Sequence, residues 1–330
     1  MQEGRFEQSG TNERNLAMEL VRVTEAAALS AGRWMGKGNK EMVDQAAVDA
    51  MRHALDGVDM NGEVVIGEGE KDEAPMLYIG EQVGNGSSPE VDVAVDPVDG
   101  TRLLSLGLPG ALAVVATAER GSMYKAPPGV FYMEKIAVGP AMRNVIDINA
   151  PVPVNLDRIA RVRDARMDDL TVVILDRPRH AEIIKQIREV GARIRLITDG
   201  DVSAAIQAAM EDYSGVDVLM GIGGATEGVL AAAAIKCIGG EIQCKIWPRN
   251  DQERGQFKSD GIDIEQVFRT DDLVKGSDVS FAATGITSGE LLDGVQYFGW
   301  GARTSSIMMR SRSGTVRYIQ ARHKWRTKKS

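Results

Sequence analysis

Cysteine is scarce in this sequence of 330 residues, which contains only Cys237 and Cys244. Both lie among apolar or small residues, and residues 1–14 contain no apolar targeting core, so we expect two reduced thiols in a cytoplasmic protein. Long apolar runs are also missing, since none approaches the roughly 20 residues that cross a bilayer. Positive charge is in deficit, with a formal net charge of −8. We therefore expect neither a membrane nor a nucleic-acid partner.

The composition that remains is typical of a globular protein with a large core. Hydrophobic residues make up 43% of the chain and charged residues 26%, and the length indicates about two domains. Strand and helix patterns alternate in the second half, which predicts an α/β fold with a parallel sheet covered by helices on both faces. We place the domain boundary in the charged segment 155–170, which gives domains over 1–160 and 161–330.

Apolar periodicity predicts the main elements. One helix is expected from a cap at Asn15 to about Met35, and a second over 40–55. Strands are expected over 63–66, 91–95, 111–118, 129–137, 171–176, 193–197 and 216–220. Further helices are expected near 180–190, after Asp201 and over 227–237.

The most informative segment is 91–102, where an apolar strand pattern leads to Asp96. Pro97 has no N–H to donate, so we expect strand pairing to stop there. Asp99 and Thr101 then stand at a predicted helix start, where free N–H groups point outward. Carboxylates, a hydroxyl and anion-seeking amides within six residues suit a metal-dependent phosphate-ester hydrolase. The alternative is a plain strand–helix turn in which Asp99 only caps the helix.

A second acidic cluster follows the predicted strand 63–66. It contains Glu68 and Glu70, which follow Gly67 and Gly69 and their sharp backbone turns, and two more acids follow by residue 73. Four acids in six residues repel one another unless a cation neutralises them, although a solvated acidic turn is the alternative. Two carboxylate clusters at two strand ends predict a site for two or three metal ions.

Basic and acidic turns follow two later strands. Arg177 and Arg179 flank a proline and suit bidentate phosphate contact, unless they form a simple surface turn. We interpret the adjacent His180 as structural rather than catalytic. Asp199 and Asp201 follow the next strand, where they bind sugar hydroxyls or cap the following helix.

A glycine-rich run over 221–224 follows the strand 216–220. A dinucleotide site is disfavoured, because the third glycine of G-x-G-x-x-G would fall on Thr226 and no suitably spaced acid follows a second strand. We interpret Glu227, at the expected helix start, as a further metal ligand.

Together these segments resemble the class II fructose-1,6-bisphosphatases, a branch of the lithium-sensitive sugar-phosphatase superfamily. The similarity runs from 15–25 to 313–317 and includes 66–70, 74–78, 96–101, 176–180, 199–202, 221–224 and 283–287. The resemblance implies the layered αβαβα sugar-phosphatase fold with two α/β domains, the first binding metal and the second binding substrate. It also implies Mn²⁺ or Mg²⁺ dependence and a gluconeogenic enzyme that hydrolyses the 1-phosphate of fructose 1,6-bisphosphate.

The resemblance also implies a role for each matching residue. The metal site would comprise Asp44, Glu68, Asp96, Asp99 and Glu227. The catalytic residues beside the reacting phosphate would be Lys40, Asp44, Asp72 and Thr101. The sugar and its phosphates would contact Gly100, Thr101, Arg102, Tyr132, Arg177, Arg179, Asp199 and Asp201. We expect a small-molecule substrate and a homo-oligomer.

Several positions depart from the family pattern, and rival functions follow from them. Gly110 replaces an asparagine, which predicts the loss of one polar substrate contact, and Thr226 replaces a proline, which predicts looser placement of Glu227. Asn39 and Glu290 replace the usual acids. Sedoheptulose 1,7-bisphosphate, alone or as a second substrate, and an inositol-type monophosphate are the alternative substrates, and a non-catalytic sugar-phosphate sensor is the alternative class.

Overall fold

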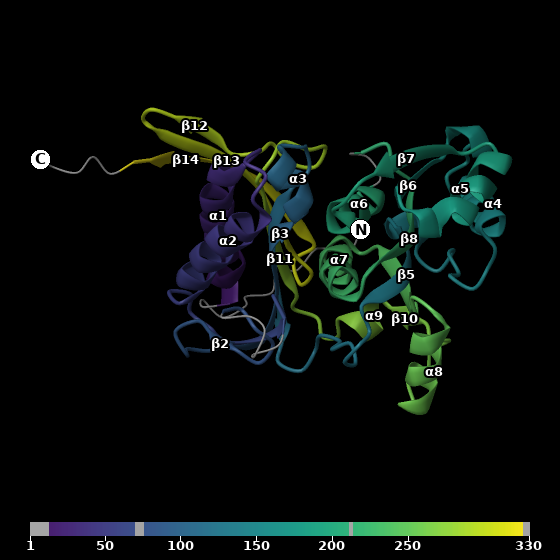
Figure 1. Ribbon diagram of the computed structural model, residues 1–330, viewed down its shortest axis with the longest axis horizontal. Coiled ribbons are helices and arrows are strands. Elements are labelled where there is room, and N and C mark those ends of the chain that lie inside the picture. The colour runs from purple at the N-terminus through teal and green to yellow at the C-terminus, as the bar shows by residue number, and fades with distance from the viewer. Residues whose placement is uncertain (1–12, 70–75, 211–213, 326–330) are drawn as a thin grey trace, which may run out of the picture.

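The computed structural model describes residues 13–69, 76–210 and 214–325. Figure 1 shows five layers that alternate between helices and sheets: a helix pair, a sheet, a second helix pair, a second sheet and a third helix pair. This order confirms the expected αβαβα architecture. Within the described ranges, no helix has the length and apolarity needed to span a membrane.

The first sheet has eight strands and draws them from both ends of the chain. Its order is β12 (Gln296–Phe298), β13 (Gly301–Arg310), β11 (Ser280–Gly285), β4 (Leu112–Glu119), β3 (Glu90–Asp99), β1 (Asn61–Ile66) and β2 (Gln82–Val83), with β14 (Thr315–Lys324) paired to β13. Among the strands of the described ranges, β1 and β3 pair in parallel and the other neighbours in this sheet are antiparallel.

The second sheet has six strands. Its order is β10 (Phe268–Arg269), β9 (Glu241–Ile246), β5 (Tyr132–Val138), β8 (Val218–Gly224), β6 (Thr171–Leu175) and β7 (Arg193–Ile197). The predicted parallel pairing is present on the β8–β6–β7 side of this sheet and is wrong for the β10–β9–β5 side. Strand β6 is parallel to β7 and β8, but β5 inserts antiparallel between β8 and β9. Local alternation of strands and helices does not reveal a strand that arrives from an earlier part of the chain.

Three pairs of helices cover the sheets. The outer pairs are α1 (Glu13–Ala31) with α2 (Lys40–Leu55) and α4 (Val152–Val162) with α5 (Ala181–Glu189), and the central pair is α6 (Asp201–Ala209) with α7 (Ala225–Ile238). Shorter helices are α3 (Thr101–Leu106), α8 (Asp251–Ser259) and α9 (Thr270–Leu273), and the 3₁₀ turns are η1 (Gly32–Trp34), η2 (Pro140–Met142), η3 (Met167–Asp169) and η4 (Pro178–His180).

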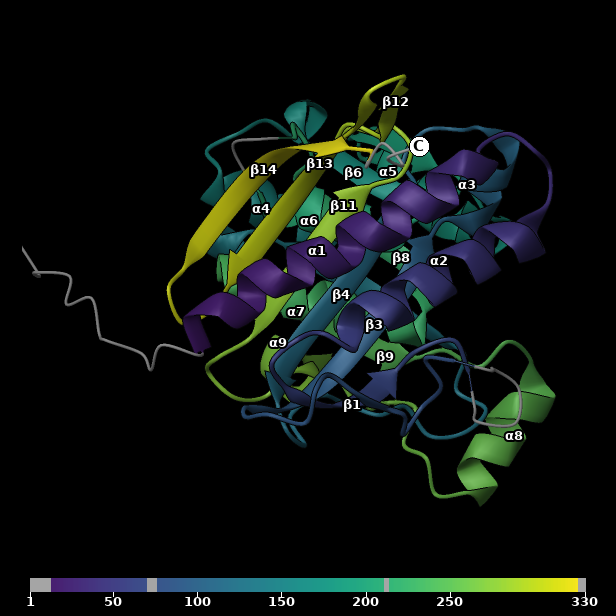
Figure 2. The same ribbon diagram turned by 90° about the vertical axis from the view of Figure 1, so that its left-hand side faces the viewer.

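Three apolar cores lie between the layers. Figure 2 shows α1 and α2 lying side by side across one face of the first sheet. One core lies under α1 and α2, one under α4 and α5, and the largest surrounds the central helices. Helix α7 explains why the central layer is so apolar. Its residues 231–234 are all alanine and almost fully buried, because sheets pack on both sides of it and small side chains let them approach.

Two local predictions were wrong. Helix α1 begins at Glu13, so Asn15 does not cap it, and the helix ends at Ala31 before the 3₁₀ turn. Strand β3 also runs through Pro97 to Asp99 instead of ending at Asp96. Its pairing with β4 shifts register between Asp96 and Asp99, so the proline sits in an irregular stretch that needs no N–H from it.

The division into 1–160 and 161–330 stays a prediction. Strand pairing crosses this point in both directions. Strand β5 precedes it and lies in the second sheet, while β11 to β14 follow it and lie in the first sheet.

Candidate active site

The irregular end of β3 positions Asp96 and Asp99. The backbone N–H of Val98 donates to Asp96 Oδ1 at 3.0 Å and fixes that carboxylate against its own turn. Gly100 then adopts φ 91°, a left-handed conformation that favours glycine, and precedes α3 as its N-cap. The N-cap of α3 is thus Gly100 and not Asp99, and Asp99 Oδ2 has no hydrogen-bond partner in the described part of the chain.

Helix α2 brings Asp44 against this turn. The Thr101 hydroxyl donates to Asp44 Oδ1 at 2.7 Å and joins two segments that are 57 residues apart. Helix α2 starts where Asn39 Oδ1 accepts the N–H of Met42 at 3.0 Å, so Asn39 acts as a good N-cap. Desolvation raises the pKa of Asp44, and the hydrogen bond from Thr101 and the charge of Lys40 offset part of that rise.

The turn after β1 carries Glu68. A Cβ on Gly67 would lie 2.0 Å from the carbonyl oxygen of Leu77, so only glycine fits there. Desolvation, followed by repulsion from Asp44, raises the pKa of Glu68 to about 7. Its side chain keeps solvent access, so water screens part of that repulsion. Asp72 and Glu70, named from the sequence, lie outside the described residues.

The junction of β8 and α7 supplies Glu227. A Cβ on Gly224 would lie 1.8 Å from Glu227 Oε2, so the glycine makes room for this carboxylate. The Thr226 hydroxyl donates to the same oxygen at 2.7 Å, which restrains Glu227 where the family proline is missing. The glycine run lies inside β8 and α7 begins directly after it, so the loop that a dinucleotide site needs is not formed there.

These carboxylates repel one another in a poorly solvated space. Desolvation raises the pKa of Asp96 well above its ordinary value, and Asp99, Glu227 and Glu68 raise it further. The pKa of Asp99 is likewise raised by desolvation and then by Asp201 and Glu227. The acids are thus close enough to interact strongly, although they come from four distant segments.

A divalent cation fits this donor set. Asp99 Oδ2 is buried and has no hydrogen-bond partner among the described residues, and carboxylate oxygens are the ligands that Mg²⁺ and Mn²⁺ prefer. However, no group of three or more His, Cys, Asp or Glu side chains in the described ranges forms a ready-made ligand cluster. The ligand set of Asp44, Glu68, Asp96, Asp99 and Glu227 therefore stays a prediction.

Arginines flank the acidic residues. Arg177 and Arg102 both donate to Asp199, with N–O distances of 2.6 and 3.2 Å. The Arg179 guanidinium donates to the carbonyl of Ile222 and lies 5.0 Å from the centre of the Tyr132 ring. The structure thus brings the predicted substrate residues of β5, η4 and the β7–α6 turn to one place, while their contact with substrate stays a prediction.

Lys135 is a residue of this site that the sequence analysis missed. It lies in β5, is 3% exposed, and donates to Asp201 Oδ2 at 2.6 Å. A Cβ on Gly223 would lie 1.9 Å from that same oxygen, so the glycine makes room for the ion pair. The ammonium also counteracts the raised pKa of Asp99. A lysine within an otherwise apolar strand pattern was the available signal.

His180 has a structural role, as expected. Its Nδ1 lies 2.7 Å from the carbonyl oxygen of Leu175, and its Nε2 accepts the N–H of Ile222 at 2.7 Å. Both ring nitrogens are engaged and the side chain is fully buried, so it ties η4 to β8 and sets the position of the neighbouring Arg179.

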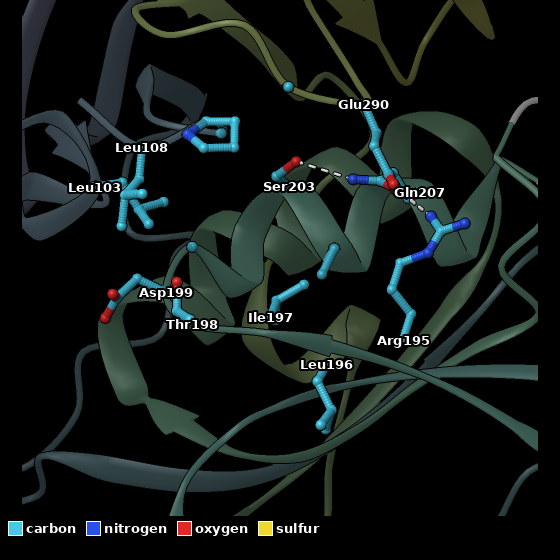
Figure 3. A pocket seen from close by; sticks show the side chains of 15 residues that line it. Leu103, Leu108, Arg195, Leu196, Ile197, Thr198, Asp199, Ser203, Gln207 and Glu290 are labelled. Carbon is cyan, nitrogen blue, oxygen red and sulfur yellow. Dashed lines mark hydrogen bonds and ion pairs between the residues drawn. The ribbon is translucent and has the colours of Figure 1, made fainter. Parts of the chain in front are cut away.

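A cavity of about 380 Å³ adjoins this site (Figure 3). Arg195, Gln207 and Glu290 meet at one end of it, whereas Leu103 and Leu108 lie on the opposite wall. Its lining also includes Gly110, Asp199 and Gly200. Glu290, one of the residues that depart from the family pattern, forms an ion pair with Arg195 in this cavity.

Comparison with known proteins gives consistent results. A family model described as bacterial fructose-1,6-bisphosphatase, glpX-encoded, matches residues 14–323. A D-fructose 1,6-bisphosphatase class 2/sedoheptulose 1,7-bisphosphatase from Synechococcus sp. (strain JA-3-3Ab) is 44% identical, covering 93% of this chain and 95% of that protein. A fructose-1,6-bisphosphatase class 2 from Haemophilus influenzae is 45% identical, covering 94% and 96%. A solved extragenic suppressor from Pyrococcus furiosus, 13% identical, covers 60% of this chain and 71% of that chain with a TM-score of 0.30, too low to carry an argument.

Proposed function

Because this chain belongs to the bacterial, glpX-encoded fructose-1,6-bisphosphatase family, and is therefore a phosphoric monoester hydrolase, we propose how its site performs the reaction. The substrate is fructose 1,6-bisphosphate, and the products are fructose 6-phosphate and inorganic phosphate. The observation that carries the proposal is the buried, unpaired oxygen of Asp99 among carboxylates with raised pKa values. A small-molecule substrate and dependence on a divalent metal follow from the family.

The metal site is proposed from the acidic residues described above. Asp44, Glu68, Asp96, Asp99 and Glu227 would hold Mg²⁺ or Mn²⁺. When bound, such ions lower the pKa of water and offset negative charge on phosphate oxygens. Desolvation disfavours the charged form of these carboxylates. A bound cation favours that form, so metal binding and loss of the carboxyl protons would occur together.

Thr101 would orient the attacking water, and Asp44 would accept the proton that this water loses. The Thr101 hydroxyl already donates to Asp44, so its lone pairs are available to accept a hydrogen bond from the attacking water. As the water oxygen bonds to phosphorus and the bond between phosphorus and the sugar O1 breaks, the proton that the water loses would pass to Asp44, and the leaving O1 would take a proton from solvent. Lys40 and Asp72 are proposed to lie beside the same phosphate.

Binding energy would come from the other substrate residues. The first N–H groups of α3, at Gly100 to Arg102, would contact the reacting phosphate. Arg177 and Arg179 would bind the remote phosphate, and Tyr132, Asp199 and Asp201 the sugar. Interactions with the remote phosphate favour bisphosphates over monophosphates.

A second substrate is supported by one observation. The Synechococcus relative, 44% identical over nearly its whole length, is named for both fructose 1,6-bisphosphate and sedoheptulose 1,7-bisphosphate. Both compounds carry phosphates at the two ends of a sugar, so the same arginines would serve both. We propose sedoheptulose 1,7-bisphosphate as the second substrate.

The decisive experiment measures phosphate release with Mn²⁺, Mg²⁺ or chelator from four compounds. Fructose 1,6-bisphosphate and sedoheptulose 1,7-bisphosphate are the candidates, and fructose 6-phosphate and an inositol monophosphate are the controls. We expect release from the bisphosphates with metal only. Release chiefly from the inositol compound would overturn the substrate assignment, and metal-dependent binding of fructose 1,6-bisphosphate without phosphate release would indicate a sensor.

A further inference from the structure

The cavity beside the β7–α6 turn has the make-up of a small-molecule site (Figure 3). Its volume of about 380 Å³ lies within the range of roughly 300–1,000 Å³ that ligand pockets occupy. Leu103, Leu108 and Leu196 give it apolar walls, and the last two of these leucines are 37% and 44% exposed. An apolar cavity with a few convergent polar groups is the usual form of a binding site.

The polar groups converge at one end of this cavity. Gln207 is 8% exposed, and its side-chain amide donates to Ser203 Oγ at 3.2 Å and accepts from Arg195 at 3.3 Å. Arg195 also forms the ion pair with Glu290. A guanidinium carries its donors in a planar fork that matches a carboxylate, and here a buried amide helps to hold that fork in place. This end of the cavity therefore suits a carboxylate.

The carboxylate of Glu290 is one that a ligand can replace. The Glu290 side chain is 58% exposed, whereas that of Arg195 is 31% exposed. An exposed ion pair contributes little to stability, so the exchange of this carboxylate for that of a ligand costs little. Apolar contact between the ligand and the leucines of the cavity would then favour the exchange.

Gly110 leaves part of this cavity open. Among the described residues, a Cβ at this position would meet only Leu103 Cδ1 within 4 Å, at 3.8 Å. Gly110 and Glu290 both replace residues that are usual in the family, and both line the cavity. Two of the residues that distinguish this chain from its family thus shape one cavity.

The cavity shares a wall with the proposed substrate site. Asp199 and Gly200 line it, and a Cβ on Gly200 would lie 3.6 Å from Asp99 Oδ2. Arg102 of α3 and Arg177, which precedes η4, both pair with Asp199. A ligand in the cavity would therefore contact a turn that carries a proposed substrate residue. Each ligand would then change the affinity for the other by the same factor.

We propose that this cavity is a second ligand site, which binds a small monocarboxylate with an apolar body and changes substrate affinity through the β7–α6 turn. The carboxylate would replace Glu290 on Arg195, and the apolar body would lie against the leucines. A phosphate ester fits less well, because its second negative charge would lie near Glu290 without a counter-charge. The effect on substrate affinity rests on the proposed function, whereas binding of the carboxylate does not.

Isothermal titration calorimetry with 3-phenylpropionate tests the site on the full chain without substrate. We expect saturable binding of one molecule per chain, and at least about tenfold weaker binding of the uncharged 3-phenylpropanamide, because the charged hydrogen bonds are lost. Arg195→Gln should weaken binding of the acid at least about tenfold for the same reason. Glu290→Gln should strengthen it about twofold to fivefold, because the competing carboxylate is gone.

Glu189→Gln is the matched control, since Glu189 is 62% exposed, pairs with Lys185 on α5 and does not line the cavity. It should bind the acid as the wild type does. The absence of saturable binding, equal affinity for the acid and the amide, or no gain in Glu290→Gln over Glu189→Gln would overturn the site. The comparison of acid and amide needs no variant, so it decides the matter even if a variant misfolds.

The second measurement is the KM for fructose 1,6-bisphosphate with and without 3-phenylpropionate. We expect the acid to change KM about fivefold or more in the wild type and to leave it unchanged in Arg195→Gln. An unchanged wild-type KM at saturating acid would overturn the coupling through the β7–α6 turn. A chain that releases no phosphate would overturn the proposed function alone, because the calorimetric result does not depend on turnover.

Discussion

At the residue scale, the acidic side chains of this site are unlike ordinary surface acids because desolvation and mutual repulsion raise the pKa values of several of them. Asp99 is buried and its Oδ2 has no partner within the described ranges, and Asp96 and Glu68 have raised pKa values. Mutual repulsion among these acids destabilises the fold unless a cation is bound. Strongly perturbed pKa values of this kind are concentrated at functional sites. Three predictions follow from individual residues.

Glu68→Gln should abolish turnover while the protein stays folded. Glutamine keeps the shape of the side chain but removes the charge that binds a cation, so phosphate release at saturating metal should fall by at least about a hundredfold. Glu63→Gln is the control, because Glu63 lies in β1, just before the turn that carries Glu68, and pairs with Arg120 and Lys125 instead. Wild-type turnover in Glu68→Gln would exclude this residue as a ligand.

Arg179→Ala should act on binding. The lost guanidinium would weaken contact with the remote phosphate equally in the ground and transition states, so KM should rise about tenfold to a hundredfold with little change in kcat. Arg188→Ala, an exposed arginine of α5, serves as the control and should match the wild type. An unchanged KM in Arg179→Ala would remove it from the substrate site.

Lys135→Met should destabilise the protein, because it leaves the buried Asp201 carboxylate without its partner. Removing one member of a buried ion pair costs about 3–5 kcal/mol, which chemical denaturation would measure. Adding Asp201→Asn to that variant should recover much of the loss. If the double variant is no more stable than Lys135→Met, the two side chains are not coupled in this way.

At the element scale, the site is built where strands end and helices begin. The β3–α3 and β8–α7 junctions each place a glycine beside a predicted ligand, at Gly100 and Gly224. These glycines serve different purposes. Gly100 supplies a left-handed turn, whereas Gly224 has φ −62° and is needed only because Glu227 occupies the space of its absent Cβ.

Gly224→Ala should therefore lower activity without unfolding the protein. Alanine accepts this backbone conformation, but its Cβ displaces Glu227 by more than an ångström, and such a shift costs about a hundredfold in rate. Thermal unfolding should be nearly unchanged. In Gly255→Ala the new Cβ meets no atom within 4 Å, so this exposed position of α8 should gain about 0.5–1 kcal/mol of stability with full activity. Equal activity in both variants would refute the argument.

At the scale of the whole molecule, two sheets and three helix pairs enclose an acidic site whose charge must be balanced. Asp96, Asp99 and Glu68 have higher pKa values in the folded chain than in the unfolded chain. Between about pH 4 and pH 7 the folded state therefore binds more protons than the unfolded state. The free energy of unfolding then falls as the pH rises.

This linkage gives a test with chelated protein. With EDTA, the melting temperature should decrease as the pH is raised from 5 to 8, and Mg²⁺ or Mn²⁺ should restore it, more strongly at the higher pH. Glu68→Gln should reduce the slope, and Glu63→Gln should keep it. A melting temperature that rises with pH under chelation would contradict the cause assigned to these pKa values.

The sequence by itself determined the local structure and the chemistry. Apolar periodicity located α2 at its observed bounds, because its buried face repeats along one segment, and the apolar pattern also gave the observed bounds of β7. Clustered acids after strand ends indicated a metal-dependent phosphatase, because like charges gather only where a counter-charge offsets them. The motif matches were specific enough to identify the family.

Only the tertiary structure decided how distant segments meet. It inserted β5 antiparallel into the second sheet, returned β11 to β14 to the first, and paired Lys135 with Asp201 across 66 residues. It also let β3 continue past Pro97 by a shift of register. The physical reason is the same in each case. These contacts join residues far apart along the chain, and local periodicity carries no information about which remote neighbour a strand or charge will face.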